Sequence, residues 1–129
     1  MKAEQLSIFL ENKPGTLSEV IGVLAAADIN LRALSLADTL EFGVLRLIVD
    51  RPEDAREALK TKGFTAHVSE VVAVEVSDKP GGLSRVLQAF TVAGVNVEYT
   101  YAFVGQPCRG AVVIFRSDDP DKAPAAVRR

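Results

Sequence analysis

The chain has 129 residues, a formal net charge of −2 and 48% hydrophobic residues. This length fits one ordinary domain or two small ones, and the charge provides no broad cationic field for nucleic acid or an anionic membrane surface. The longest apolar run, Val20 to Ala27, is far shorter than the ~20 residues of a membrane-spanning helix, and the N-terminus lacks the pattern of a secretory signal. One cysteine and one histidine exclude an intrachain disulfide and a tetrahedral zinc site within one chain. We therefore predict a cytoplasmic protein without cofactor or metal, and without nucleic acid or membrane partners.

A repeated segment organises the chain. The residues 12–18 (NKPGTLS) recur 66 positions later as residues 78–84 (DKPGGLS). The same offset relates the apolar positions of the helix that should follow each segment, which indicates the same buried helix face in both copies. The sequence therefore predicts two domains, residues 1–70 and 71–129, each small enough to depend on its neighbour.

The first domain begins with a strand over residues 5–10, where apolar and polar residues alternate. Pro14 and Gly15 end this strand, and Thr16 with Glu19 predicts a capping box at the start of a helix that fades near Asp28. The further elements are expected in this order: strands over 31–37 and 42–49, a helix from Pro52 to Gly63, and a strand over 64–69. The order β-α-β-β-α-β is that of a ferredoxin-like α+β unit, with two helices on one face of an antiparallel sheet.

The second domain repeats this plan and stops early. Its expected elements are a strand over 71–76, a helix over 83–93, and strands over 97–104 and 111–115. Pro124 limits any terminal helix to a short one, and no residues are left for a sixth element. The second sheet thus lacks its last strand, and we expect an intermolecular or inter-repeat strand to cover its edge.

Each Pro-Gly segment lies at a junction from strand to helix, where the first N–H groups of the helix have no partners within it. These donors and the helix dipole attract an anion, and the glycine lets the backbone approach it. A side-chain oxygen of Asn12 or Asp78 just upstream can accept a hydrogen bond from an ammonium group. The two features together describe the ends of a free amino acid, although Pro-Gly before a helix is also common turn chemistry.

The two segments, with Ile29-Asn30 and Val95-Asn96 after the helices, resemble the ACT domain twice in tandem. The resemblance implies a regulatory, allosteric module of ferredoxin-like fold that binds an amino acid between paired domains, at the first strand-to-helix loop and the start of the following strand. The positions that it points to in this chain are Asn12, Pro14, Gly15, Thr16, Leu17, Ile29 and Asn30, and in the second copy Asp78, Pro80, Gly81, Gly82, Leu83, Val95 and Asn96.

Several of these residues, and others, have purely structural interpretations. Asn30 and Asn96 suit a turn or cap after a helix as well as they suit a ligand contact. His67 is expected at a sheet edge or surface, and Cys108 as a spare thiol in the loop 105–110. The alternating Tyr99, Tyr101 and Phe103 favour packing against a neighbouring element, and Asp118, Asp119 and Asp121 favour an acidic helix start over a cation site.

Four functions of different classes follow. The leading hypothesis is a non-enzymatic sensor that binds a free amino acid, forms a homodimer and acts on a metabolic enzyme or regulator. The second is a regulatory subunit of an amino-acid biosynthetic enzyme, because the first ~75 residues are similar to the small subunit of acetohydroxyacid synthase. The third, an enzyme, lacks any assembled set of nucleophile, base and oxyanion donors in the sequence. The fourth is a structural pairing module whose loops bind nothing.

Overall fold

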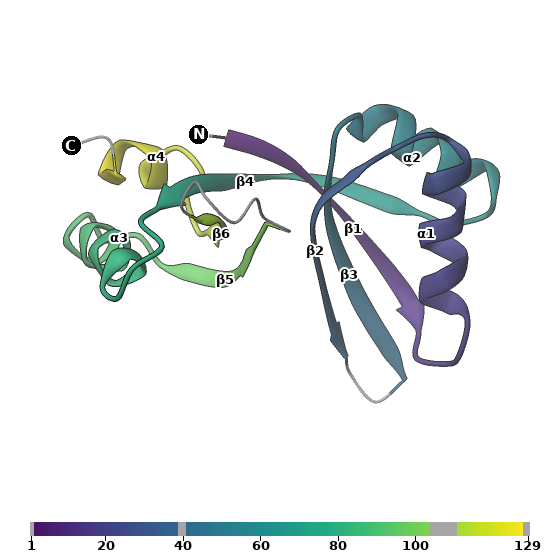
Figure 1. Ribbon diagram of the computed structural model, residues 1–129, viewed down its shortest axis with the longest axis horizontal. Helices are drawn as coiled ribbons and strands as arrows, with labels where there is room; N and C mark the ends of the chain where they lie inside the picture. Colours follow the sequence, from purple (N-terminus) through teal and green to yellow (C-terminus); the bar gives the residue numbers. More distant parts are fainter. Residues whose placement is uncertain (1, 39–40, 104–110, 128–129) are drawn as a thin grey trace. The chain divides into compact units, whose positions relative to one another are not determined.

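The computed structural model describes residues 2–38, 41–103 and 111–127. They form two compact units: a first repeat, Glu4–Ser69, and a second repeat that consists of residues 70–127 with Lys2 and Ala3. The elements are β1 (Lys2–Glu11), α1 (Thr16–Ala26), β2 (Leu31–Asp38), β3 (Phe42–Val49), α2 (Pro52–Thr61), β4 (Ala66–Val76), α3 (Gly82–Val92), β5 (Val97–Ala102), β6 (Ala111–Ser117) and α4 (Lys122–Val127) (Figure 1). This is the predicted α+β fold of two ferredoxin-like repeats.

The first repeat is one sheet covered by α1 and α2 on one face (Figure 1). Its strands lie in the order β2-β3-β1-β4, and β3 pairs antiparallel with both β1 and β2. Alternate residues of β1 and β3 point to the same face, so these strands supply one side of the core and the helices supply the other. The fully or almost fully buried residues of this core are Leu6, Ile8, Leu10, Val20, Leu24, Leu45, Leu47, Ala55 and Leu59.

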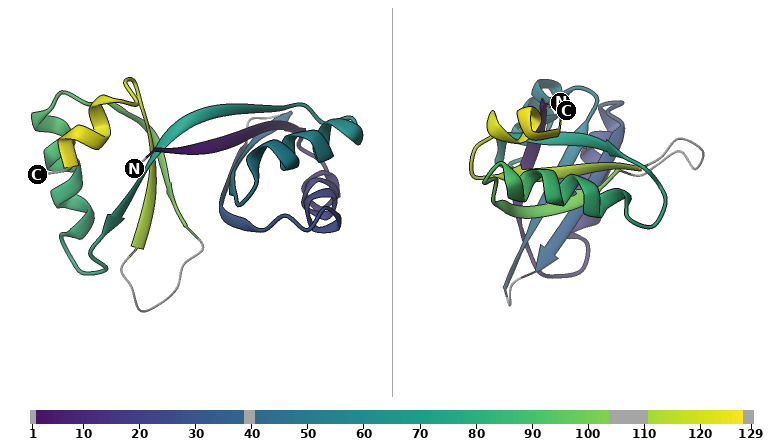
Figure 2. Two further views of the ribbon diagram at one scale, coloured as in Figure 1. Left: turned by 90° about the horizontal axis from the view of Figure 1, so that it is seen from above. Right: turned by 90° about the vertical axis from the view of Figure 1, so that its left-hand side faces the viewer.

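The second repeat has the same plan with fewer strands. β6 lies between β4 and β5 and pairs antiparallel with both, and α3 and α4 lie side by side over them (Figure 2). The rings of Phe90 in α3 and Phe115 in β6 meet edge to face with their centroids 5.0 Å apart, a favourable aromatic geometry. Val72, Val74, Val76, Val95, Val113 and Ala123 complete this core.

The predicted strands over 64–69 and 71–76 are a single strand, β4. No glycine, proline or turn residue separates the two segments, so nothing interrupts the extended backbone between them. β1 lies on the side of β4 opposite to β6, and the first two described residues of β1 belong to the second repeat. α4 is six residues long, and Pro124 is its third residue, where the missing N–H would have no helical partner in any case.

The ends of α1 and α3 are built alike. Asp28 and Gly94, which follow the two helices, both have a positive φ, of 59° and 73°. A cation then covers the last carbonyls: the Arg51 guanidinium donates to the carbonyl oxygens of Ala27 (3.1 Å) and Asp28 (2.6 Å). In the second repeat the Lys122 ammonium group donates to the carbonyl oxygen of Gly94 at 3.5 Å. Positive charge at this end complements the helix dipole.

The starts of the two helices differ in one residue. In the first repeat the Thr16 hydroxyl donates to the carbonyl oxygens of Glu11 (2.8 Å) and Lys13 (3.1 Å). In the second repeat Gly82 takes the place of Thr16, and a Cβ atom built on Gly82 would lie 2.0 Å from the carbonyl oxygen of Ser77. The backbone of α3 therefore approaches the end of β4 so closely that only glycine fits.

Replacement of Asp28 by glycine should stabilise the protein. The left-handed backbone conformation is strained for a residue with a side chain, and Asp28→Gly relieves this strain by about 1 kcal/mol. The reverse change in the second repeat, Gly94→Asp, should destabilise by a similar amount. Urea denaturation of both variants measures the two changes, and a lower midpoint for Asp28→Gly would contradict this account of the helix end.

Replacement of Gly82 by threonine, which copies the first repeat, should destabilise the protein by about 1–3 kcal/mol, because the new side chain overlaps the Ser77 carbonyl group. Gly22→Ala is the matched control: its new methyl group meets no atom within 4 Å, and it should stabilise α1 by about 0.5–1 kcal/mol. Thermal unfolding followed by circular dichroism distinguishes the two, and an unchanged midpoint for Gly82→Thr would show that α3 can move away from β4.

Candidate functional site

Both Pro-Gly helices begin without a side-chain cap. Gly15 and Gly81 are the N-cap residues of α1 and α3, and their backbones have the same left-handed conformation, with φ of 91° and 90°. No side chain donates or accepts a capping hydrogen bond at either position. The capping box predicted from Thr16 and Glu19 is therefore wrong. Thr16 is already inside the helix, and its hydroxyl group is bonded to carbonyl oxygens of the preceding loop.

Without a side-chain cap, N–H groups of the first helical turn can receive a ligand, except that the Gly82 N–H of α3 already donates to the carbonyl oxygen of Lys79 (3.0 Å). These groups carry the partial positive charge of the helix N-terminus and can donate to a carboxylate. Asn12 and Asp78, the two residues that begin the repeated segments, are exposed at the entrance to these helices. In the first repeat the chain is held there by a hydrogen bond from the Asn12 N–H to the carbonyl oxygen of Glu41, 2.8 Å long.

A small hollow of about 100 Å³ adjoins the start of α1. It is lined by Leu10, Glu11, Asn12, Lys13, Thr16, Leu17, Leu36 and Gly43. Three of the predicted site residues, Asn12, Thr16 and Leu17, thus meet in one place. The hollow is smaller than the ~300 Å³ at which small-molecule sites usually begin, so it has room for only part of a ligand, and its leucines offer an apolar wall beside the polar loop.

The predicted residues after the helices lie elsewhere. Asn30 is separated from Gly15 by the whole of α1, which at 1.5 Å per residue is about 16 Å long. Asn96 stands in the same relation to Gly81 in the second repeat. A single repeat therefore does not bring its Pro-Gly loop and its asparagine to the same point.

The backbones of the two asparagines have a structural partner that the sequence did not suggest. The Asn30 N–H donates to Asp50 Oδ1 (3.2 Å), and the Asp50 N–H donates back to the Asn30 carbonyl oxygen (3.2 Å). Asn96 and Asp118 form the same reciprocal pair, with distances of 3.1 and 3.2 Å. A sequence pattern could have pointed to these two aspartates, because each stands two residues before a proline: Asp50 before Pro52 and Asp118 before Pro120. The asparagine side chains take no part in these bonds.

The four apolar site residues divide into two kinds. Ile29 and Val95 are buried and belong to the two cores, so a ligand does not reach their side chains. Leu17 is half-buried beside the first core, whereas Leu83 is 40% exposed on α3. Leu83 lines a separate shallow hollow of about 680 Å³ together with Ser84, Leu87, Gln88, Thr91 and Val92.

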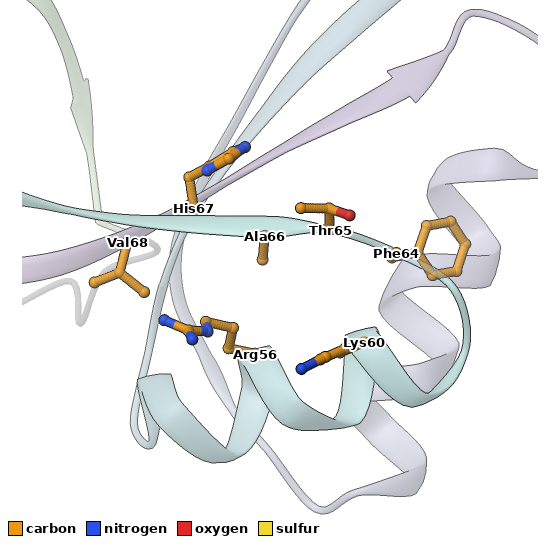
Figure 3. A pocket seen from close by; sticks show the side chains of 7 residues that line it. All are labelled: Arg56, Lys60, Phe64, Thr65, Ala66, His67 and Val68. Atoms are coloured by element: carbon orange, nitrogen blue, oxygen red, sulfur yellow. The ribbon is translucent and has the colours of Figure 1, made fainter.

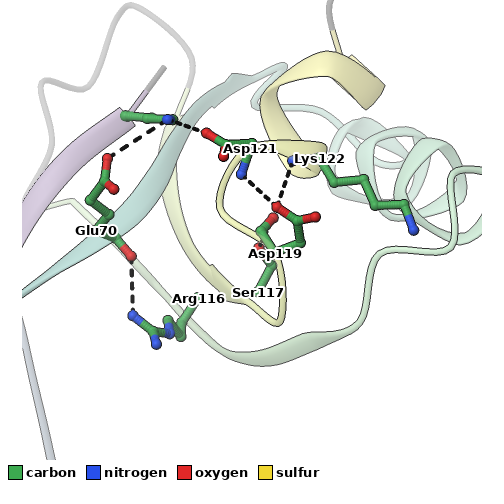
Figure 4. Close-up of polar contacts among 7 residues, drawn as sticks. Glu70, Arg116, Ser117, Asp119, Asp121 and Lys122 are labelled. Carbon is green, nitrogen blue, oxygen red and sulfur yellow. Dashed lines mark hydrogen bonds and ion pairs between the residues drawn. The ribbon is translucent and has the colours of Figure 1, made fainter.

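The aspartates of the second repeat serve separate structural roles, and Figure 4 shows those of Asp119 and Asp121. Asp118 holds Asn96, and Asp119 Oδ1 accepts from the N–H groups of Asp121 and Lys122 (3.0 and 3.3 Å) at the start of α4. Asp121 pairs with the ammonium group of Lys2 and raises its pKa. Within residues 2–38, 41–103 and 111–127 no group of side chains could hold a metal ion.

The other candidates occupy ordinary positions. His67 is exposed on β4, and the rings of Tyr99 and Tyr101 stack along β5 with their centroids 6.5 Å apart. Cys108 and its loop lie outside the described residues. In the described part of the chain no helix is long and apolar enough to span a membrane.

Comparison with known proteins agrees with this fold. A crystal structure of a protein from Bacteroides thetaiotaomicron is 42% identical and has a TM-score of 0.92, over 99% of this chain and 88% of that chain. The regulatory subunit of aspartate kinase from Thermus thermophilus, in a ligand-free form, is 20% identical with a TM-score of 0.71, over 97% and 88% of the two chains. The corresponding subunit from Thermus flavus is 17% identical with a TM-score of 0.61, over 95% and 88%. The Thermus proteins share the fold.

No protein with a curated description matches this sequence. A family model described as an ACT domain pair matches residues 1–128. The resemblance seen in the repeated Pro-Gly segments thus extends over almost the whole length, and the chain belongs to the ACT domain pair family.

Proposed function

We propose that this protein is a regulatory sensor that binds a free amino acid at the starts of α1 and α3. The observation that carries this proposal is the pair of uncapped helix N-termini, each formed by a left-handed glycine. Each of these helix ends offers N–H donors for a carboxylate. The exposed residue before each of them, Asn12 or Asp78, offers an acceptor for an ammonium group. We propose a regulatory role without catalysis.

The chemistry of binding assigns a role to each part of the loop. The N–H groups of the first turn donate to the effector carboxylate, and the helix dipole favours its negative charge. The Asn12 amide oxygen or the Asp78 carboxylate accepts from the effector ammonium group. Since Asp78 carries a full charge and Asn12 does not, the second repeat should hold the ammonium group more tightly. Near the first loop, Leu17 and Leu36 favour an apolar side chain on the effector.

A homodimer completes the proposal. Asn30 and Asn96 stand at the far ends of α1 and α3 from the Pro-Gly loops, so they can contact the same effector only if paired ACT domains supply them. An effector that binds between paired domains stabilises one arrangement of the domains over another. Such differential affinity is what allosteric regulation requires.

A regulatory subunit of an amino-acid biosynthetic enzyme is the second candidate. The Thermus proteins that share this fold are regulatory subunits of aspartate kinase, and the first ~75 residues resemble the small subunit of acetohydroxyacid synthase. Affinity capture from a native lysate tests this candidate. It should recover a biosynthetic enzyme in an amount that changes when the effector is added, and recovery of no such enzyme would count against it.

The first test is a thermal-unfolding screen of the purified protein against the twenty amino acids. An effector at 100 times its dissociation constant stabilises the folded state by ~2.7 kcal/mol, which should raise the unfolding midpoint by several degrees. The screen should give at least one such amino acid. An unchanged midpoint with all twenty would overturn the proposal.

The second test locates the site with matched variants. Asp78→Asn removes the charge that faces the ammonium group but keeps an acceptor oxygen. Calorimetric titration should show that effector binding at the second repeat weakens by about five- to tenfold, since a hydrogen bond to a charged group contributes about 1–1.5 kcal/mol more than a neutral one. Glu57→Gln removes an exposed carboxylate from α2 and should leave affinity unchanged. Equal affinities for the two variants would place the effector away from α3.

A further inference from the structure

A second hollow lies on the first repeat, away from the Pro-Gly loop. It has a volume of about 470 Å³ and lies between α2, residues 64–65 and the beginning of β4 (Figure 3). The residues that line it are Arg56, Lys60, Phe64, Thr65, Ala66, His67 and Val68. This volume falls within the range of about 300 to 1,000 Å³ that is typical of small-molecule sites.

The charged groups of the hollow are cations. Arg56 and Lys60 stand one turn apart on α2, and both side chains extend into the space between α2 and β4 (Figure 3). No carboxylate is among the lining residues. Arg56 has only a long, exposed ion pair with Glu53 (3.8 Å), which holds it weakly. Lys60 has no ion pair within the described part of the chain. Two positive charges thus face one space without strong internal partners.

The wall opposite α2 is mostly apolar. Ala66 and Val68 point from β4 toward α2, and the Phe64 ring closes one end of the hollow (Figure 3). All three side chains are half-buried against the first core. Thr65 and His67 leave the strand on its other side. A ligand in this space would meet an aromatic ring and short apolar side chains on one side and two cations on the other.

We propose that this hollow binds a phosphate ester of a small organic molecule. The Arg56 guanidinium matches an oxyanion with two parallel hydrogen bonds, and the Lys60 ammonium adds a compact second charge. Two cations match the two negative charges of a phosphate monoester, whereas a single carboxylate would leave one of them unneutralised. The remaining volume, beside Phe64 and Val68, takes the organic part. This site is separate from the amino-acid site, so the sensor has a second input of different chemistry.

Adenosine monophosphate, adenosine and inorganic phosphate serve as probes, and amide NMR spectra of the full chain record their binding. Adenosine monophosphate should cause saturable shifts of residues 56–60 and 64–68. Adenosine, which lacks the phosphate, should cause none, and inorganic phosphate should bind more weakly than the ester. The absence of saturable shifts with adenosine monophosphate would overturn the proposal. If adenosine bound as tightly as adenosine monophosphate, the proposal would also be overturned. If inorganic phosphate bound as tightly as the ester, the organic part would have no role in binding.

Variants of single cations test the assignment to these residues. Lys60→Gln and Arg56→Gln should each weaken the binding of adenosine monophosphate at least ~tenfold, because each removes a charge-assisted hydrogen bond. Lys62→Gln is the matched control, since it makes the same change two residues further along, outside the hollow. It should change the affinity less than ~twofold. A similar loss in all three variants would indicate attraction to general positive charge and would contradict a built site.

Discussion

The left-handed glycine before each of the helices α1 and α3 is the constraint on which the account depends. With φ near +90°, Gly15 and Gly81 turn the chain directly from a strand into a helix. No side chain caps the first N–H groups at either turn. In α3 the Gly82 N–H donates to the carbonyl oxygen of Lys79 (3.0 Å), so the N–H groups after it are the donors offered to a ligand. At the other end the same helices are closed: Arg51 and Lys122 cover the last carbonyls, and Asp50 and Asp118 hold the next residues of the chain. Side chains thus hold the polar groups where α1 and α3 end, whereas no side chain caps these helices where they begin.

The two repeats form the same strand-to-helix loop with different residues. Thr16 bonds to the loop of the first repeat, whereas Gly82 lets α3 approach the end of β4 in the second. Asn12 is neutral and Asp78 is charged. The fold is therefore duplicated while the chemistry of the two loops is not, and the proposed function predicts two different affinities for the effector. The first repeat also carries the cationic hollow beside α2, which has Arg56 and Lys60 as its charges.

Much of the fold could be predicted from the sequence because it depends on local periodicity. Apolar residues at helical and strand spacing predicted the helices and strands, and the 66-residue offset predicted the duplicated plan. The prediction of a capping box failed because Gly15, and not Thr16, is the N-cap residue, and the Thr16 hydroxyl donates to carbonyl oxygens of the preceding loop. The Asn30–Asp50 and Asn96–Asp118 pairs join residues about twenty positions apart, and the α2–β4 hollow joins separate elements, so neither follows from local pattern. Of the residues proposed for the site, Asn12, Thr16 and Leu17 lie together beside the start of α1, whereas Ile29 and Val95 lie in the core, because burial depends on the packed fold.

The central claim is that the uncapped starts of α1 and α3 receive the carboxylate of a free amino acid. The most direct measurement is the amide NMR spectrum of the protein during titration with the amino acid that stabilises it. The account predicts that the N–H signals of the first turns, residues 16–18 and 83–84, shift downfield in a saturable way, because these groups begin to donate to an anion. A stabilising amino acid that leaves these signals unchanged while it shifts others would contradict the claim and place the site elsewhere.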